Sequence, residues 1–112
     1  MPAIKEPKEW NFDKIGHKGK VFPTTDLSSR GQVVLMESEK GLDVSLIQNE
    51  CDYFYYVIKG SGTFVIEGKE EICEEGDLVV VPAGSKYTFK GKLRLLLFST
   101  PPWSEDQEEV VK

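Results

Sequence analysis

Histidine and cysteine, the residue types of most zinc sites and of many catalytic sites, are scarce in this chain. Of its 112 residues one is a histidine, His17, and two are cysteines, Cys51 and Cys73, which form no C-x-x-C pair. A zinc site needs three or four converging ligands, and a Ser-His-Asp triad needs its histidine at a defined position. The composition therefore excludes most histidine chemistry. The polar segment 1–10 lacks the apolar centre of an export signal, so we expect reduced thiols and a cytoplasmic protein.

The net charge of the chain limits the classes of partner that we expect it to bind. Fourteen basic and nineteen acidic residues give a formal net charge of −5, which repels a nucleic-acid backbone. The main basic concentration, at Lys14, Lys18 and Lys20, is interpreted as a solvated flexible segment, with nucleic-acid contact as the less favoured alternative. No apolar run approaches the roughly 18 residues of a membrane span. We expect neither a nucleic-acid nor a membrane partner.

The elements that position these residues are predicted to be short strands. Glycines at 60, 68, 76, 84 and 91 recur every seven or eight residues among turn-forming neighbours. Apolar and β-branched runs lie between them, and similar runs precede and follow. This spacing predicts eight or nine strands between 31 and 100, no helix, and an all-β sandwich or barrel. Seven of the expected strands are assigned to residues 32–37, 42–47, 53–58, 63–66, 78–81, 87–89 and 93–98.

Two of these features carry specific expectations. The segment Gly60-Ser61-Gly62 is interpreted as a hairpin turn rather than a phosphate-binding loop. Residues 93–98 are almost continuously apolar and are expected to be buried on both faces of their strand.

The chain is expected to divide into an arm, a barrel and a tail. Residues 1–30 hold three of the six prolines and scattered aromatics, and they are expected to pack on the barrel or on a neighbouring subunit. The barrel spans 31–103. Residues 104–112 form an acidic tail that begins with a capping-box pattern, which predicts a short helix, with disorder as the alternative.

Two sequence blocks resemble the signatures of the cupin superfamily. Gly76, Pro82 and Gly84 have the spacing of the second signature, and residues 56–62 are similar to the end of the first. Residues 95–103 look like the ending of small cupins described as mannose-6-phosphate isomerase-like. The resemblance covers 32–103. It implies a double-stranded β-helix, a jelly-roll-like barrel, with its site in the mouth between the two sheets.

The metal ligands of the family are absent. Metal-binding cupins usually carry His-x-His and a glutamate in the first signature and a histidine in the second. The corresponding positions hold Leu46 and Gln48 or Ile47 and Asn49, then Tyr53, and finally Tyr87. Neutral amides and tyrosines with a reference pKa near 10 make a poor metal site. The resemblance therefore predicts no metal and no other cofactor, and His17 is expected to lie far from the barrel.

The resemblance instead places polar and aromatic side chains in the barrel mouth. Their flat faces, phenol hydroxyls and amides are typical of a site that binds a small planar or polyhydroxy ligand. The alternative is that these side chains simply fill a small barrel. The expected ligand-binding residues are Gln48, Asn49, Tyr53, Tyr55, Tyr87 and Phe89.

Three hypotheses for function follow. The leading one is a metal-free, homodimeric small cupin that binds a sugar-like molecule. The second is an isomerase or lyase that uses tyrosine acid–base chemistry or unusual metal ligands, and a tyrosine of depressed pKa would favour it. The third is a structural or interaction module with a filled barrel, which the lack of a cavity would favour. No catalytic residue is assigned.

Overall fold

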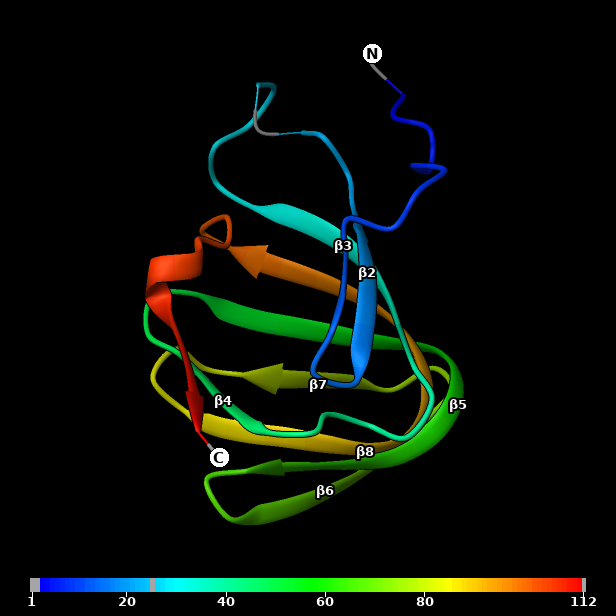
Figure 1. Cartoon of the computed structure of the whole chain (residues 1–112), viewed down its shortest axis with the longest axis vertical. Helices are drawn as coiled ribbons and strands as arrows, with labels where there is room; N and C mark the ends of the chain where they lie inside the picture. The colour runs from blue at the N-terminus through cyan, green and yellow to red at the C-terminus, as the bar shows by residue number, and fades with distance from the viewer. Residues whose placement is uncertain (1–2, 25, 112) are drawn as a thin grey trace.

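The computed structural model describes residues 3–24 and 26–111, and within them the prediction of an all-β fold is confirmed (Figure 1). These residues form nine strands and one 3₁₀ turn, η1, and no helix among them is long and apolar enough to cross a membrane. The elements are β1 (Phe12–Lys14), β2 (His17–Val21), β3 (Gln32–Ser38), β4 (Ser45–Gln48), β5 (Asp52–Ile66), β6 (Lys69–Glu74), β7 (Leu78–Val81), β8 (Lys86–Thr100), η1 (Glu105–Gln107) and β9 (Glu108–Val111).

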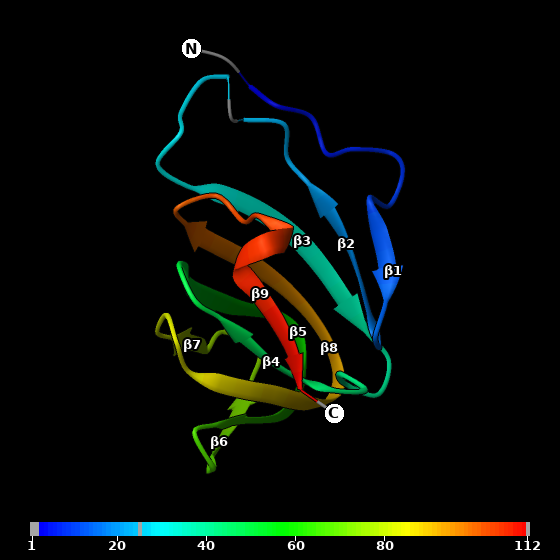
Figure 2. The ribbon, with the colours of Figure 1, turned by 60° about the vertical axis from the view of Figure 1, so that its left-hand side comes forward.

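The two long strands β5 and β8 organise the barrel. They pair antiparallel along almost their whole length and curl together from one layer of the barrel into the other (Figure 2). In one layer β7 and β3 flank them, and β2 and β1 extend that layer beyond β3. In the other layer β6 flanks β5, while β4 and β9 extend from β8. This arrangement is the jelly-roll-like double-stranded β-helix that was expected.

Gly60 and Gly91 do not form the predicted turns, because both lie inside the long strands. Their φ angles are 94° and 118°, and a Cβ on either would lie 2.1 Å or 2.6 Å from a carbonyl oxygen of the paired strand. Glycine therefore permits a bend where two backbones approach closely. Six strands, rather than eight or nine, span the region from 31 to 100. The glycines at 68, 76 and 84 do lie in turns, as predicted.

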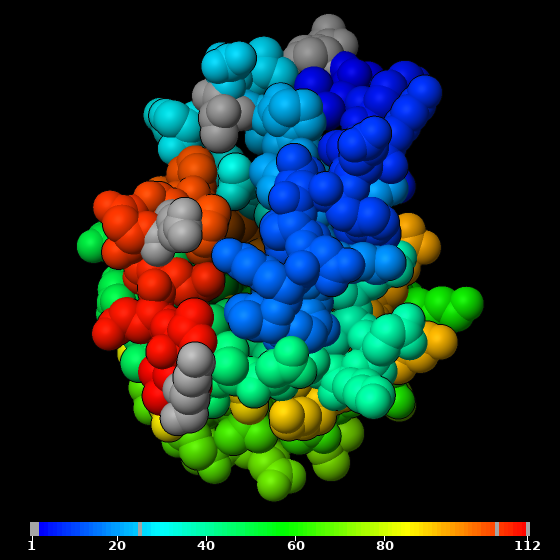
Figure 3. All heavy atoms as spheres, in the orientation of Figure 1, coloured from blue at the N-terminus to red at the C-terminus, as the bar shows by residue number. Residues whose placement is uncertain are grey.

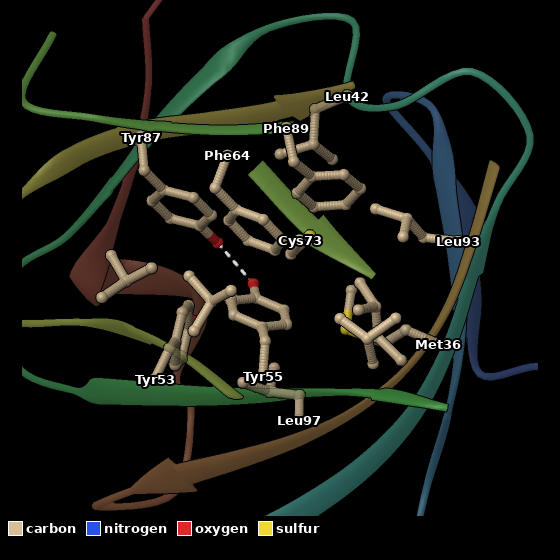
Figure 4. Packing of buried hydrophobic residues seen from close by; sticks show 14 of the residues in the cluster. Met36, Leu42, Tyr53, Tyr55, Phe64, Cys73, Tyr87, Phe89, Leu93 and Leu97 are labelled. Carbon is tan, nitrogen blue, oxygen red and sulfur yellow. Dashed lines mark hydrogen bonds between the residues drawn. The ribbon is translucent and has the colours of Figure 1, made fainter. Parts of the chain in front are cut away.

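Burial alternates along the strands instead of covering both faces of β8. Leu93, Leu95 and Leu97 are buried, whereas Phe98 is 44% exposed, so the expectation of two-sided burial was wrong. The reason is that, among the residues that the structure describes, no further strand covers the outer face of β8 at Phe98. On the inner side Phe64 and Phe89 are fully buried with ring centroids 5.0 Å apart (Figure 4). These rings fill one half of the barrel.

The arm and the tail are built into the sheets. The β1–β2 hairpin adds to the edge of β3, and β9 adds to the edge of β4. The tail contains only the single turn η1 before β9, so the predicted short helix is replaced by a strand. The open edge of β4 offers unpaired backbone groups, and Val110 and Val111 favour an extended chain. Figure 3 shows the hairpin and the tail adjacent on one face of the molecule.

Candidate functional site

A cavity of about 290 Å³ occupies the half of the barrel that the phenylalanines leave empty. Its walls come from the β1–β2 hairpin, from β3, β5 and β8, and from the tail. Val34, Met36 and Leu97 supply much of the apolar surface. Tyr53 and Tyr87 border the same space, so the barrel is not completely filled.

Three of the six expected ligand-binding residues line this cavity: Tyr53, Tyr55 and Tyr87. They project inward from β5 and β8, because residues two apart on a strand share one face. Phe89 also points inward but is buried against Phe64, below the cavity.

The two expected amides lie outside the cavity wall. Gln48 is 2% exposed, and its Oε1 accepts hydrogen bonds from the backbone N–H groups of Glu50 and Cys51 at 2.7 and 3.0 Å. Asn49 points to the surface, where its Nδ2 donates to the backbone carbonyl of Gln107 at 3.2 Å. Gln48 thus shapes the turn before β5, and Asn49 fastens the tail.

The arm and tail supply site residues that sequence reasoning missed. His17 was expected to lie far from the barrel, but the β1–β2 hairpin places it in the cavity wall together with Lys14. Trp103 and Glu108 border the cavity from the other side. The resemblance to cupins covers residues 32–103, so it leaves out Lys14, His17 and Glu108, and it assigned no site role to Trp103. The aromatics of the arm were the single available clue that this segment contacts the barrel.

Hydrogen bonds link the tyrosines to each other and to the tail. The hydroxyl groups of Tyr55 and Tyr87 lie 2.7 Å apart and are both buried (Figure 4). The Tyr53 hydroxyl donates to Glu108 Oε2 at 3.3 Å. The rings of Tyr53 and Tyr87 meet edge-on with centroids 6.2 Å apart. The tail is therefore fastened over the cavity by a carboxylate that accepts from the barrel.

Burial raises the pKa of all three cavity tyrosines above the ordinary value of 10. For Tyr53 and Tyr87 the neighbouring ionisable groups raise the pKa further. Each phenol therefore stays protonated at neutral pH and acts as a hydrogen-bond donor. This result does not favour acid–base catalysis by tyrosine, which requires a depressed pKa.

His17 is a neutral imidazole at neutral pH. Its burial, followed by the nearby positive charge of Lys14, lowers its pKa from 6.5 to about 4. Its Nδ1 is buried and has no hydrogen-bond partner among the described residues. An unpaired nitrogen of a neutral imidazole can accept a proton or a hydrogen bond from a group that reaches it.

The pKa of Glu108 is shifted upward, whereas that of His17 is shifted downward. Burial raises its pKa above 4.5, while hydrogen bonds from Trp103 and Tyr53 and the charge of Lys14 oppose the shift. The cavity thus carries a base, His17, and a carboxyl group that holds its proton more tightly than an exposed one.

The described part of the chain contains no cluster of the usual metal-binding side chains. Within residues 3–24 and 26–111, no three or more histidine, cysteine, aspartate or glutamate side chains gather closely enough to hold an ion. Cys51 and Cys73 are buried free thiols, and burial raises the pKa of both. A thiol that resists ionisation is a poor metal ligand.

Comparisons with known proteins agree with this architecture. The family model described as Cupin domain matches residues 34–98. A variant of Streptomyces PAC13 with uridine is 25% identical, with a TM-score of 0.89 over 100% of this chain and 93% of that chain. The structure of Pac13 described as a unique nucleoside dehydratase is 24% identical, with a TM-score of 0.89 over 99% of this chain and 92% of that chain. KdgF from Halomonas sp. is 16% identical, with a TM-score of 0.73 over 95% and 98% of the two chains. No curated protein matches the chain.

Proposed function

The chain belongs to the cupin domain family, and we propose that its cavity binds a small molecule that combines a planar ring with hydroxyl groups, as a nucleoside does. The observation that carries the proposal is the combination of aromatic walls with converging polar groups in about 290 Å³. That volume lies near the lower end of the range for small-molecule sites.

The chemistry of the lining supports this ligand class. Tyr53, Tyr87 and Trp103 provide aromatic surface for a planar ring. Glu108 and Ser99 provide oxygen acceptors for ligand hydroxyls, and His17 adds an imidazole nitrogen. The similarity to a PAC13 structure with uridine supports the same class, since the fold and the position of the barrel are shared over the whole chain.

Other expectations remain proposals of the same kind. We propose that binding requires no metal, since Tyr53 and Tyr87 stand at two of the family's ligand positions. We also retain four predictions: a sugar-like ligand, a relationship to mannose-6-phosphate isomerase-like cupins, a homodimer and a cytoplasmic location.

NMR titration of the labelled protein tests the proposal, with uridine, uracil and a free hexose as the probes. We expect saturable shifts for residues that line the cavity, with uridine the tightest of the three. Tyr53→Phe, which removes a cavity hydroxyl, should weaken binding several-fold, whereas Tyr56→Phe on the outer face of β5 should not. If none of the probes shifts the cavity residues, the proposal is wrong.

A second function, acid–base catalysis in the same cavity, is favoured by one observation. His17 is neutral and burial raises the pKa of Glu108, and both border the cavity, so a proton acceptor and a carboxyl group with increased proton affinity can face one ligand. The description of Pac13 as a nucleoside dehydratase is consistent with such chemistry, because a dehydration removes a proton and protonates a leaving hydroxyl.

Deuterium exchange tests this second function. An aldose in its open-chain form has a C–H group made acidic by the adjacent carbonyl. We expect wild-type protein in D₂O to exchange that hydrogen, and His17→Gln to abolish exchange while the NMR titration still detects binding. Exchange that persists in His17→Gln would exclude His17 as the base.

A further inference from the structure

Two buried tyrosine hydroxyls form part of the inner wall of the cavity. Tyr55 and Tyr87 both line the cavity, and their hydroxyl oxygens lie 2.7 Å apart (Figure 4). The two residues are 1% and 2% exposed, so bulk solvent supplies almost no hydrogen-bond partner to either. The ring of Tyr55 packs against Phe64 and Phe89, with centroid separations of 5.1 and 6.2 Å. The packed half of the barrel therefore holds this hydroxyl pair in place.

The hydroxyl pair of Tyr55 and Tyr87 has one more proton than its own hydrogen bond uses. Burial raises the pKa of both phenols above the ordinary value of 10, so each hydroxyl keeps its proton at neutral pH. One of the two protons lies in the bond between the oxygens. Neither hydroxyl makes a second hydrogen bond within residues 3–24 and 26–111. One buried O–H group therefore has no acceptor in the described part of the chain.

The other polar side chains of the cavity have their own partners or lie elsewhere in its wall. The Tyr53 hydroxyl donates to Glu108 Oε2 at 3.3 Å, and the Ser99 hydroxyl donates to the backbone carbonyl of Pro101 at 2.7 Å. No hydrogen bond joins the hydroxyl pair to Glu108 or His17 in the residues that the structure describes. A buried donor without an acceptor is unfavourable, so a ligand atom that accepts from it removes this cost. The unmatched O–H is thus available to a molecule that fills the cavity.

We propose that the hydroxyl pair of Tyr55 and Tyr87 is a subsite for a carbonyl oxygen carried by the planar ring of the ligand. The subsite rests on the proposed function, because it needs such a ring inside the cavity. A carbonyl oxygen accepts without donating, so it matches the unmatched O–H, whereas an amino group would place a second donor against it. The ring then points toward the packed half of the barrel, and the hydroxyl groups of the ligand lie toward Glu108 and the tail.

Uridine labelled with ¹³C at its two ring carbonyls tests the subsite. We expect the signal of one carbonyl to move downfield when uridine binds wild-type protein, because accepting a hydrogen bond polarises the C=O bond. The double variant Tyr55→Phe, Tyr87→Phe removes both hydroxyls and should abolish that shift. It should also weaken uridine binding about tenfold. Tyr53→Phe is the matched control, since it removes a hydroxyl of the same cavity that donates to Glu108, and the carbonyl shift should persist in it.

The outcomes separate the subsite from the proposed function. Absence of uridine binding to wild-type protein would overturn the proposed function and the subsite with it. Saturable binding without a downfield carbonyl shift would overturn the subsite alone, and so would a shift that persists in the folded double variant. The wild-type measurement decides the proposal even if the double variant is too unstable to study.

Discussion

The hydroxyl groups of Tyr55 and Tyr87 lie 2.7 Å apart inside the barrel, although 32 residues separate them in the chain. The contact joins β5 to β8 at the floor of the cavity, directly above the phenylalanines that fill the other half. It separates the packed half of the barrel from the half that is open to a ligand.

Loss of one hydroxyl of this pair is expected to destabilise the protein. Tyr55→Phe leaves the buried Tyr87 hydroxyl without its partner, at a cost of about 1–3 kcal/mol. The double variant Tyr55→Phe, Tyr87→Phe should cost less than the two single variants together, because neither unpaired group remains. Urea unfolding of the three variants measures this coupling, and additive losses would contradict it.

The single histidine should titrate far below its ordinary pKa. We expect the imidazole NMR signals of His17 to titrate with a midpoint near 4 rather than 6.5. Lys14→Met should raise that midpoint by removing a positive charge, and Asp13→Asn should lower it by removing a negative one. A midpoint near 6.5 in the folded protein would show that the imidazole is exposed rather than buried in the cavity wall.

The same shift makes stability depend on pH. Because the pKa of His17 is lower in the folded state than in the unfolded state, protonation favours unfolding. The stabilisation is complete above pH 6.5 and is lost as the pH falls toward 4, by about 3 kcal/mol. Urea unfolding of wild-type protein and His17→Gln across this range isolates the effect, because the variant should lack this part of the pH dependence.

Glu108 should make the stability of the protein depend on pH in the opposite direction to His17. Burial raises its pKa, so the folded state binds the proton more tightly and stability falls as the pH rises from 4.5 through the raised value. Glu108→Gln removes this penalty and keeps an oxygen that can accept from Tyr53. The variant should therefore gain stability relative to wild type as the pH rises to neutral. A constant difference in the free energy of unfolding across that range would contradict the expectation.

Substitution by alanine should destabilise the protein more at Gly60 than at Gly68. Gly60→Ala forces a Cβ to within 2.1 Å of the Lys92 carbonyl oxygen at a positive φ, and we expect a loss of more than about 3 kcal/mol. Gly68 also has a positive φ, but its Cβ would meet no atom within 4 Å, so Gly68→Ala should cost about 1–2 kcal/mol. Thermal and urea unfolding compare the two, and equal losses would show that no close backbone approach exists at Gly60.

The sequence alone predicted the barrel, because strand periodicity, turn glycines and the signature around Pro82 are local patterns. It also placed Tyr53, Tyr55 and Tyr87 on the inner face, since side chains alternate along a strand and the resemblance fixes which face is inside. Those inferences need only the order of residues within single elements.

The tertiary structure decided what closes the cavity. The β1–β2 hairpin and the tail, which lie at opposite ends of the chain, bring His17 and Glu108 to one space. No local pattern predicts this meeting, because it depends on which sheet edges remain free to pair. Whether Gly60 turned the chain or bent a strand also depended on the paired backbone across from it. Contacts between distant segments therefore determined the site, while local periodicity determined the barrel that carries it.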